Sequence, residues 1–117
     1  MKKLVNRIDH VAWICELANI EAHVAEMERV LDIRLEHSER PELGIVVYHN
    51  MAAGIEVVAP FAEPSEANRS FHERLAAGGE GLMGVVFGVK NLDGHKARLE
   101  GMGYAIGGLI DQSHAPW

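Results

Sequence analysis

The sequence predicts an α+β domain whose first 60 residues form one βαβββ module. Strand-like apolar stretches at residues 4–15 and 43–60 flank a segment, 20–31, whose apolar residues follow the spacing of a helix. In addition, residues 82–89 overlay residues 8–15 with a shift of 74, and both stretches precede a helical segment. The same β-then-α order in two places indicates duplicated modules.

Composition excludes several classes of protein. A chain of 117 residues with 48% apolar and 24% charged residues is typical of one soluble globular domain. Eleven basic and seventeen acidic residues give a net charge of −6 without a basic run, which argues against nucleic-acid binding. The lone Cys15 excludes a disulfide framework, and the start of the chain has no apolar stretch suited to a signal peptide or a membrane span. We therefore expect a cytoplasmic protein with no membrane partner.

The first predicted strand, residues 4–15, carries one histidine among apolar residues. Side chains alternate along a strand, so His10 shares a face with Ala12 and Ile14, while Trp13 and Cys15 lie on the other face. A histidine in such surroundings needs a hydrogen-bond partner or a metal ion. His10 is therefore either a structural histidine or a ligand, and Ala12 and Ile14 are candidate substrate contacts beside it.

A helix is predicted over residues 20–31, with Asn19 as its N-cap. His23 lies beside the apolar stripe of this helix and is interpreted as a residue of the helix flank. A short strand at 33–37, a turn at 40–42 and a hairpin of strands 43–49 and 54–60 complete the first module.

Glu56 is the second unusual residue, because its apolar neighbours predict a buried strand in which an unpaired carboxylate is costly. An even-numbered hairpin loop would place His49 opposite Gly54 and bring His49 and Glu56 to the same side of the sheet. An odd-numbered loop would not. The alternative for Glu56 is an edge-strand carboxylate that points to water.

The second half of the chain is expected to hold a linker and a partial module. Residues 61–81 form the linker with a short helix at 66–77, and its glycine cluster lacks the lysine and hydroxyl residue of a phosphate-binding loop. Residues 82–117 form the partial second module, with a strand at 82–89, a helix at 94–101 and the start of a strand at 104–106.

Together, the motifs at residues 8–11, 54–57 and 79–82 resemble the vicinal oxygen chelate superfamily. This superfamily includes glyoxalase I, methylmalonyl-CoA epimerase, extradiol dioxygenases and the bleomycin- and fosfomycin-resistance proteins. The resemblance implies the glyoxalase/bleomycin-resistance/dioxygenase fold, with paired βαβββ modules of which the second is incomplete here. It also implies a cleft that holds a divalent metal or a small ligand.

The resemblance carries over only half of a metal site. His10 matches the histidine ligand on the first strand of module one, and Glu56 matches the carboxylate ligand on its last strand. The third position falls on Gly84, which cannot ligate, and the fourth would fall near residue 130, beyond Trp117. Further ligands would have to come from His49, His114 or a partner chain. The ligand types suit zinc, nickel, iron, manganese or cobalt.

Three functions follow from the resemblance. The first is a metal-dependent lyase, isomerase or epimerase, in which Glu56 moves a proton next to a carbonyl and His49, Ala12 and Ile14 contact the substrate. The second is a metal-free protein that sequesters a drug or metabolite. The third, an extradiol-type dioxygenase, needs two histidines and a carboxylate, and Gly84 counts against it most heavily.

The short second module predicts self-association. It leaves an open sheet edge and an apolar face, around Val85 and Phe87, without cover. A homodimer would bury both, since symmetric pairing is the commonest form of association. The alternative is that the natural protein continues beyond Trp117 and this chain is a fragment.

Overall fold

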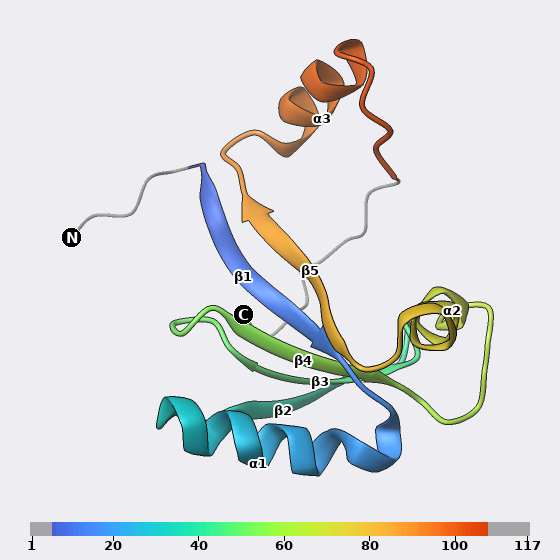
Figure 1. Cartoon of the computed structure of the whole chain (residues 1–117). Helices are drawn as coiled ribbons and strands as arrows, with labels where there is room; N and C mark the ends of the chain where they lie inside the picture. The colour runs from blue at the N-terminus through green and yellow to red at the C-terminus, as the bar shows by residue number, and fades with distance from the viewer. Residues whose placement is uncertain (1–5, 108–117) are drawn as a thin grey trace. The chain divides into compact units, whose positions relative to one another are not determined.

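A computed structural model of the chain describes residues 6–107. Five strands and three α-helices follow one another as in Figure 1, and a short 3-10 turn, η1 (Leu17–Asn19), precedes the first helix. In chain order the elements are β1 (Arg7–Ile14), α1 (Ile20–Leu31), β2 (Glu36–Arg40), β3 (Ile45–Asn50), β4 (Ile55–Pro60), α2 (Arg69–Gly78), β5 (Gly81–Gly88) and α3 (Leu92–Gly101).

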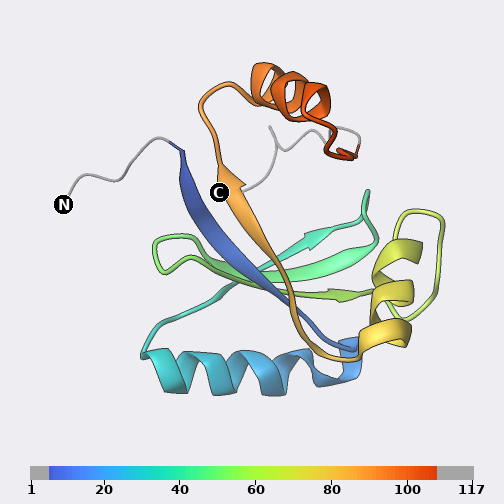
Figure 2. The same cartoon turned by 45° about the horizontal axis from the view of Figure 1, so that its top comes forward.

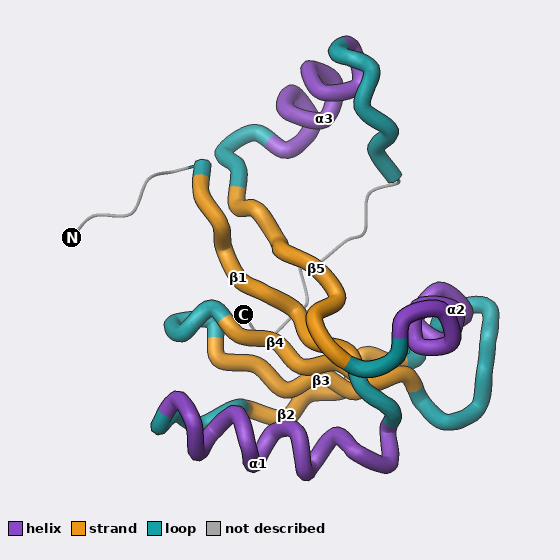
Figure 3. Tube along the Cα trace, in the orientation of Figure 1, coloured by secondary structure: helices purple, strands orange, loops and turns teal. Residues whose placement is uncertain are grey.

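The strands form one sheet in the order β2-β3-β4-β1-β5, coloured orange in Figure 3. β2, β3 and β4 pair antiparallel, whereas β1 pairs parallel with β4 and places Ala12 opposite Glu56. The order β1-α1-β2-β3-β4 confirms the predicted βαβββ module, and the whole is the predicted α+β fold.

Helix α1 lies along one face of the sheet, which we call the α1 face (Figure 2). Its apolar stripe is buried there, as the helical spacing predicts, and its last turn ends at Asp32 in the left-handed region with φ of 53°. The buried core of this face comprises Cys15, Ile20, Val24, Leu35, Val46, Val57 and Ala59.

The opposite face, which we call the site face, is apolar at one end and polar at the other. Helix α2 covers the apolar end, where its Leu75 and Phe71 pack on strand residues. Those residues are Ile14, Ile45, Val47 and Val58. The polar end carries His10, His49 and Glu56, because alternation along β1, β3 and β4 points these side chains to the same face.

Asn68, at the start of α2, is fully buried and fixes the connection between β4 and α2. Its side-chain oxygen accepts a hydrogen bond from the Ser65 backbone at 2.8 Å. Its amide nitrogen donates to the carbonyls of Gly44 at 3.1 Å and Glu63 at 3.2 Å. One side chain therefore ties the turn before β3 to the loop before α2.

The strand bounds agree with the shift of 74 residues on which the predicted duplication depends. β1 covers Arg7–Ile14 and β5 covers Gly81–Gly88, so both ends differ by the predicted shift of 74. Each strand is followed by a helix, α1 and α3. The described chain divides into two compact units, Asp9–Val86 and a smaller unit that contains α3. None of the helices in residues 6–107 has the length and apolarity needed to cross a membrane.

Three sequence predictions differ from the structure. The strand at 104–106 is wrong: the Tyr104 amide bonds to the Leu99 carbonyl at 3.1 Å, so the backbone folds back on α3. The strand predicted at 33–37 lies at Glu36–Arg40, three residues later. The helix predicted at 66–77 begins at Arg69. His114 lies outside the described residues.

The loop between β3 and β4 is even-numbered, one of the two alternatives that the sequence left open, but the register differs from the one considered for it. Asn50 pairs with Ile55, so His49 lies opposite Glu56 rather than opposite Gly54. Gly54 adopts φ of 72°, and its carbonyl accepts a hydrogen bond from the Val11 amide at 2.9 Å. This left-handed residue turns the chain into β4 and holds it against β1.

Candidate functional site

The polar end of the site face brings His10 and Glu56 together. His10 Nε2 lies 3.7 Å from Glu56 Oε2, although the two residues come from strands that are far apart in the sequence. Both side chains are largely buried, with exposed fractions of 9% and 14%. The sequence predicts that the two side chains share one face and approach each other, and the structure confirms this. Their role as metal ligands stays a prediction.

Asp9 orients the imidazole of His10. An Asp9 carboxylate oxygen lies 2.8 Å from His10 Nδ1. A proton on Nδ1 would be donated to this carboxylate, and the lone pair of Nε2 would then face Glu56. The Nε2 lone pair and the Glu56 carboxylate would repel each other unless a proton or a cation lay between them. The His10–Glu56 pair is therefore suited to binding a proton or a cation.

Glu56 is largely shielded from water, which disfavours the charged form of its carboxylate. Burial raises the pKa of Glu56 above its usual 4.5, while electrostatic interactions with His10 and Arg40 lower this pKa by less. A carboxylate with a raised pKa is a better proton acceptor than an exposed one. Glu56 is therefore the candidate general base of this face.

Arg40 is the residue that sequence reasoning missed. It was assigned to a turn, but it ends β2 opposite Ile45, and its side chain is buried with an exposed fraction of 4% and paired with Glu42. Strand alternation places it on the site face, where its charge acts on Glu56. Residues 36–40 are all polar and lie on an edge strand, so no apolar alternation marked Arg40 as buried.

The other predicted contacts are distributed along the same face. Glu56 lies between two of these residues in the sheet. The buried His49 is opposite Glu56 on β3, and Ala12 is opposite Glu56 on β1. Ile14 lies further along β1, in the core that packs against α2. The structure therefore places His49 and Ala12 beside the His10–Glu56 pair and Ile14 away from it.

The described residues do not complete a metal site at His10 and Glu56. Metal centres in proteins use three or four ligands, and His10 and Glu56 supply two. His49 does not join them, since the single group of three ligand atoms within 4.8 Å of one another in residues 6–107 lies elsewhere. Gly84 occupies the third position, and an added Cβ there would meet nothing within 4 Å. The third side chain is missing rather than sterically excluded.

A second polar cluster lies on the α1 face around Glu80. This residue sits between Gly79 and Gly81, whose φ angles of 70° and 144° let the chain turn between α2 and β5. One carboxylate oxygen accepts hydrogen bonds from the Glu16 amide and the Asn19 side chain, both at 2.9 Å. The other lies 3.2 Å from His23 Nε2. Asn19 thus precedes α1 as predicted, but its side chain binds Glu80 instead of capping the helix.

These interactions stabilise the charged form of Glu80. The Asn19 and Glu16 hydrogen bonds, with His23, lower its pKa from 4.5 to about 2. His23 was interpreted as a residue of the helix flank, and the structure instead pairs it with Glu80 across the connection to β5. That partner could not be inferred from the helical pattern, because it comes from the linker.

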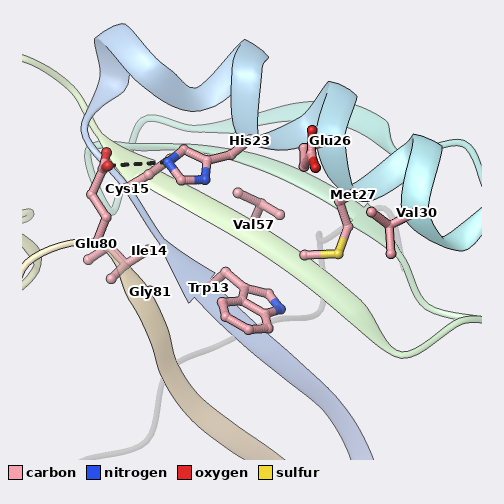
Figure 4. A pocket seen from close by; sticks show the side chains of 10 residues that line it. All are labelled: Trp13, Ile14, Cys15, His23, Glu26, Met27, Val30, Val57, Glu80 and Gly81. Atoms are coloured by element: carbon pink, nitrogen blue, oxygen red, sulfur yellow. Dashed lines mark hydrogen bonds and ion pairs between the residues drawn. The ribbon is translucent and has the colours of Figure 1, made fainter.

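Cys15 lies beside this cluster and next to a cavity. Burial, together with the charges of Glu80 and Glu16, raises the pKa of its thiol to about 12. The cavity has a volume of about 360 Å³ and lies between α1, the end of β1 and Val57 of β4 (Figure 4). Its lining includes Trp13, Cys15, His23, Met27, Val30 and Glu80.

We expect the Glu80→Gln variant to lose part of the acid dependence of stability. The folded-state pKa of Glu80 is depressed, so its contribution is present above pH 4.5 and is lost as the pH falls towards 2. The free energy of unfolding of the variant should therefore fall less steeply between these pH values. Denaturant titrations at several pH values measure this slope. The matched control is Glu21→Gln on the exposed side of α1, and an equal slope in Glu80→Gln and wild type would contradict the prediction.

No protein-family profile matches this sequence, and no curated protein matches it significantly. Solved structures do match. A methylmalonyl-CoA epimerase from Streptomyces coelicolor, in complex with 2-nitronate-propionyl-CoA, is 21% identical with a TM-score of 0.67, over 86% of this chain and 74% of that one. A hypothetical protein from Bacillus halodurans is 19% identical with a TM-score of 0.69, over 86% and 70% of the two chains.

A third neighbour is a methylmalonyl-CoA epimerase from Mycobacterium tuberculosis. It is 19% identical with a TM-score of 0.65, over 88% of this chain and 69% of its own. Similarity at such low identity establishes fold and not activity. The chain therefore has the glyoxalase-like fold of these structures.

Proposed function

We propose that this protein binds a small carbonyl compound on the site face and moves a proton at the carbon next to the carbonyl, as an isomerase or epimerase does. The observation that carries the proposal is Glu56, a buried carboxylate with a raised pKa that faces His10 at 3.7 Å. Two neighbours of this fold are epimerases of a CoA thioester, which makes an acyl thioester the first substrate class to test.

In the proposed reaction Glu56 accepts the proton from the carbon, and the bond electrons move onto the carbonyl oxygen to give an enolate. The positive charge of Arg40 acts on the same region as Glu56 and would stabilise the enolate. Asp9 holds His10 in place, so that its Nε2 faces the reacting groups. Return of a proton from Glu56 to the same side of the carbon gives exchange with solvent, and epimerisation needs a proton delivered from solvent to the opposite side.

The test is deuterium exchange. Wild-type protein is incubated in deuterated buffer with methylmalonyl-CoA, and the mass of the thioester is followed with time. Incorporation of one deuterium at the carbon next to the carbonyl supports the proposal. Absence of exchange, with the thioester shown to bind by calorimetry, rejects the catalytic proposal and leaves the alternative function, a metal-free binding protein.

The binding alternative is favoured by Gly84, which removes one ligand of the metal set that the resemblance implies. A metal-dependent form of the reaction would need ligands beyond His10 and Glu56. Metal analysis of protein purified without a histidine tag, before and after the Glu56→Gln substitution, separates the two forms. A stoichiometric ion that is lost with Glu56 supports the metal-dependent form.

We also propose that the protein forms a homodimer through β5. This strand is an edge of the sheet, and its apolar residues Leu82 and Val85 are 49% and 42% exposed. An apolar edge with unpaired backbone groups favours pairing with a second copy. Light scattering should show a dimer for the wild type and a monomer for Val85→Lys, whereas Leu31→Lys on α1 should stay dimeric. A monomeric wild type with a cooperative melt contradicts the proposal.

A further inference from the structure

The cluster on the α1 face has the composition of a metal centre. Cys15, His23 and Glu80 each offer one ligand atom, and the sulfur, nitrogen and oxygen atoms all lie within 4.8 Å of one another. They come from three separate places, the residue after β1, helix α1 and the loop before β5 (Figure 4). The proposed function on the site face uses none of them.

The ligand types and their spacing suit zinc. Thiolate, imidazole and carboxylate are the three ligand classes that zinc binds, at about 2.0–2.3 Å. Two such ligands on one tetrahedral ion are separated by roughly 3.3 Å or slightly more. His23 Nε2 and Glu80 Oε1 are already 3.2 Å apart, so an ion needs no large movement of this pair.

The carboxylate is also held by partners outside the ligand set. Glu80 Oε2 accepts two hydrogen bonds of 2.9 Å, from the Glu16 amide and from the Asn19 side chain. Hydrogen bonds of this kind orient ligating carboxylates in metal centres. The other oxygen, Oε1, pairs with His23 Nε2, and an ion bound between these two atoms would replace that hydrogen bond.

The cavity beside the cluster supplies a second observation. All three residues line it, and so does Trp13, whose indole Nε1 is buried. This nitrogen is the one buried side-chain polar atom of residues 6–107 without a hydrogen-bond partner. A buried donor without a partner is costly, and an oxygen of a ligand in the cavity would satisfy it.

We propose that Cys15, His23 and Glu80 form a zinc-class metal site, separate from the His10–Glu56 pair, with its remaining coordination position open to this cavity. On binding, the Cys15 thiol releases its proton to the solvent as the sulfur–metal bond forms. Three protein ligands and one open position are the arrangement of catalytic rather than structural zinc sites. The small ligand would occupy this cavity and present an oxygen to the ion.

The experiment is a cobalt titration of the full chain without a histidine tag, followed by absorption. Cobalt bound to a thiolate gives a near-ultraviolet charge-transfer band, which reports on Cys15 alone because the chain has one cysteine. We expect this band to saturate at one equivalent and to be displaced by zinc. His23→Ala and Glu80→Gln should weaken cobalt binding by at least about tenfold, and Cys15→Ser should abolish the band.

Matched variants keep the outcome interpretable. Glu56→Gln should leave the cobalt band unchanged, which separates a failure of this metal site from a failure of the proposed function on the site face. His37→Ala removes an exposed histidine elsewhere and serves as a second control. If Cys15→Ser does not fold, His23→Ala decides the question, because His23 is 44% exposed and its loss is tolerable. No band in the wild type at one equivalent of cobalt, or an unchanged affinity in His23→Ala, overturns the proposal.

Discussion

The Glu56→Gln variant is expected to lose proton exchange at the carbon next to the carbonyl by about 10²- to 10⁴-fold. Glutamine has the size and the polar oxygen of glutamate but cannot accept the proton. The raised pKa of Glu56 predicts that the variant folds well, because between pH 4.5 and the raised value the folded protein retains a proton that the unfolded chain loses. Stability of the wild type therefore falls as the pH rises through this window, and the variant should lack that fall.

The control for this variant is Glu39→Gln, which changes an exposed carboxylate on β2. It should exchange at the wild-type rate. Exchange rates from mass spectrometry and free energies of unfolding from denaturant titration are needed for all three proteins. Equal exchange by Glu56→Gln and the wild type would exclude Glu56 as the base, whatever the stability data show.

Replacing Asn68 should produce the largest loss of stability among the polar residues described. Asn68→Ala removes the hydrogen bonds to the carbonyls of Gly44 and Glu63 and the one from the Ser65 amide. The Gly44 carbonyl keeps its hydrogen bond from the Phe61 amide. At about 1 kcal/mol for each hydrogen bond lost in a buried setting, the free energy of unfolding should fall by about 3 kcal/mol. The melting temperature should fall by roughly 10 °C or more.

Two further variants show whether the amide of Asn68 is responsible. Asn68→Asp keeps the oxygen that accepts from Ser65 but turns a second oxygen towards carbonyl groups, and it should destabilise the protein at neutral pH. Asn50→Ala removes a side chain that donates to the Arg34 carbonyl on the exposed surface, and it should cost about 1 kcal/mol. A fully stable Asn68→Asp would show that the donated hydrogen bonds contribute little.

The local patterns of the sequence predicted the first module well. Periodicity in residues 8–15 and 20–31 gave a strand and a helix with nearly the observed bounds, because burial of one face leaves a regular apolar signal. His10 and Glu56 stood out since each is a polar residue in an apolar strand. Their proximity was expected from strand alternation and from the resemblance, whereas the hairpin register considered for His49 differs by two residues from the observed one.

Contacts between distant segments were not predictable in the same way. Arg40 lies in a polar edge strand without apolar alternation, so its burial depends on neighbours that local spacing does not reveal. The pairing of His23 with Glu80 joins a helix to a glycine-rich linker, and no periodicity connects them. The strand at 104–106 failed because β propensity alone cannot show that the chain has no neighbouring strand to pair with there.

The parallel pairing of β1 with β4 has a consequence for how the protein acquires its site. His10 and Glu56 meet only after the chain between them has folded into α1, β2 and β3 and brought β4 back beside β1. Parallel pairing across such a long segment closes a large loop, and contacts of this kind form slowly. A partly folded chain would therefore hold α1 or the β3–β4 hairpin without any binding site. A ligand on the site face recognises only the completed topology, so its binding free energy stabilises the protein against global unfolding.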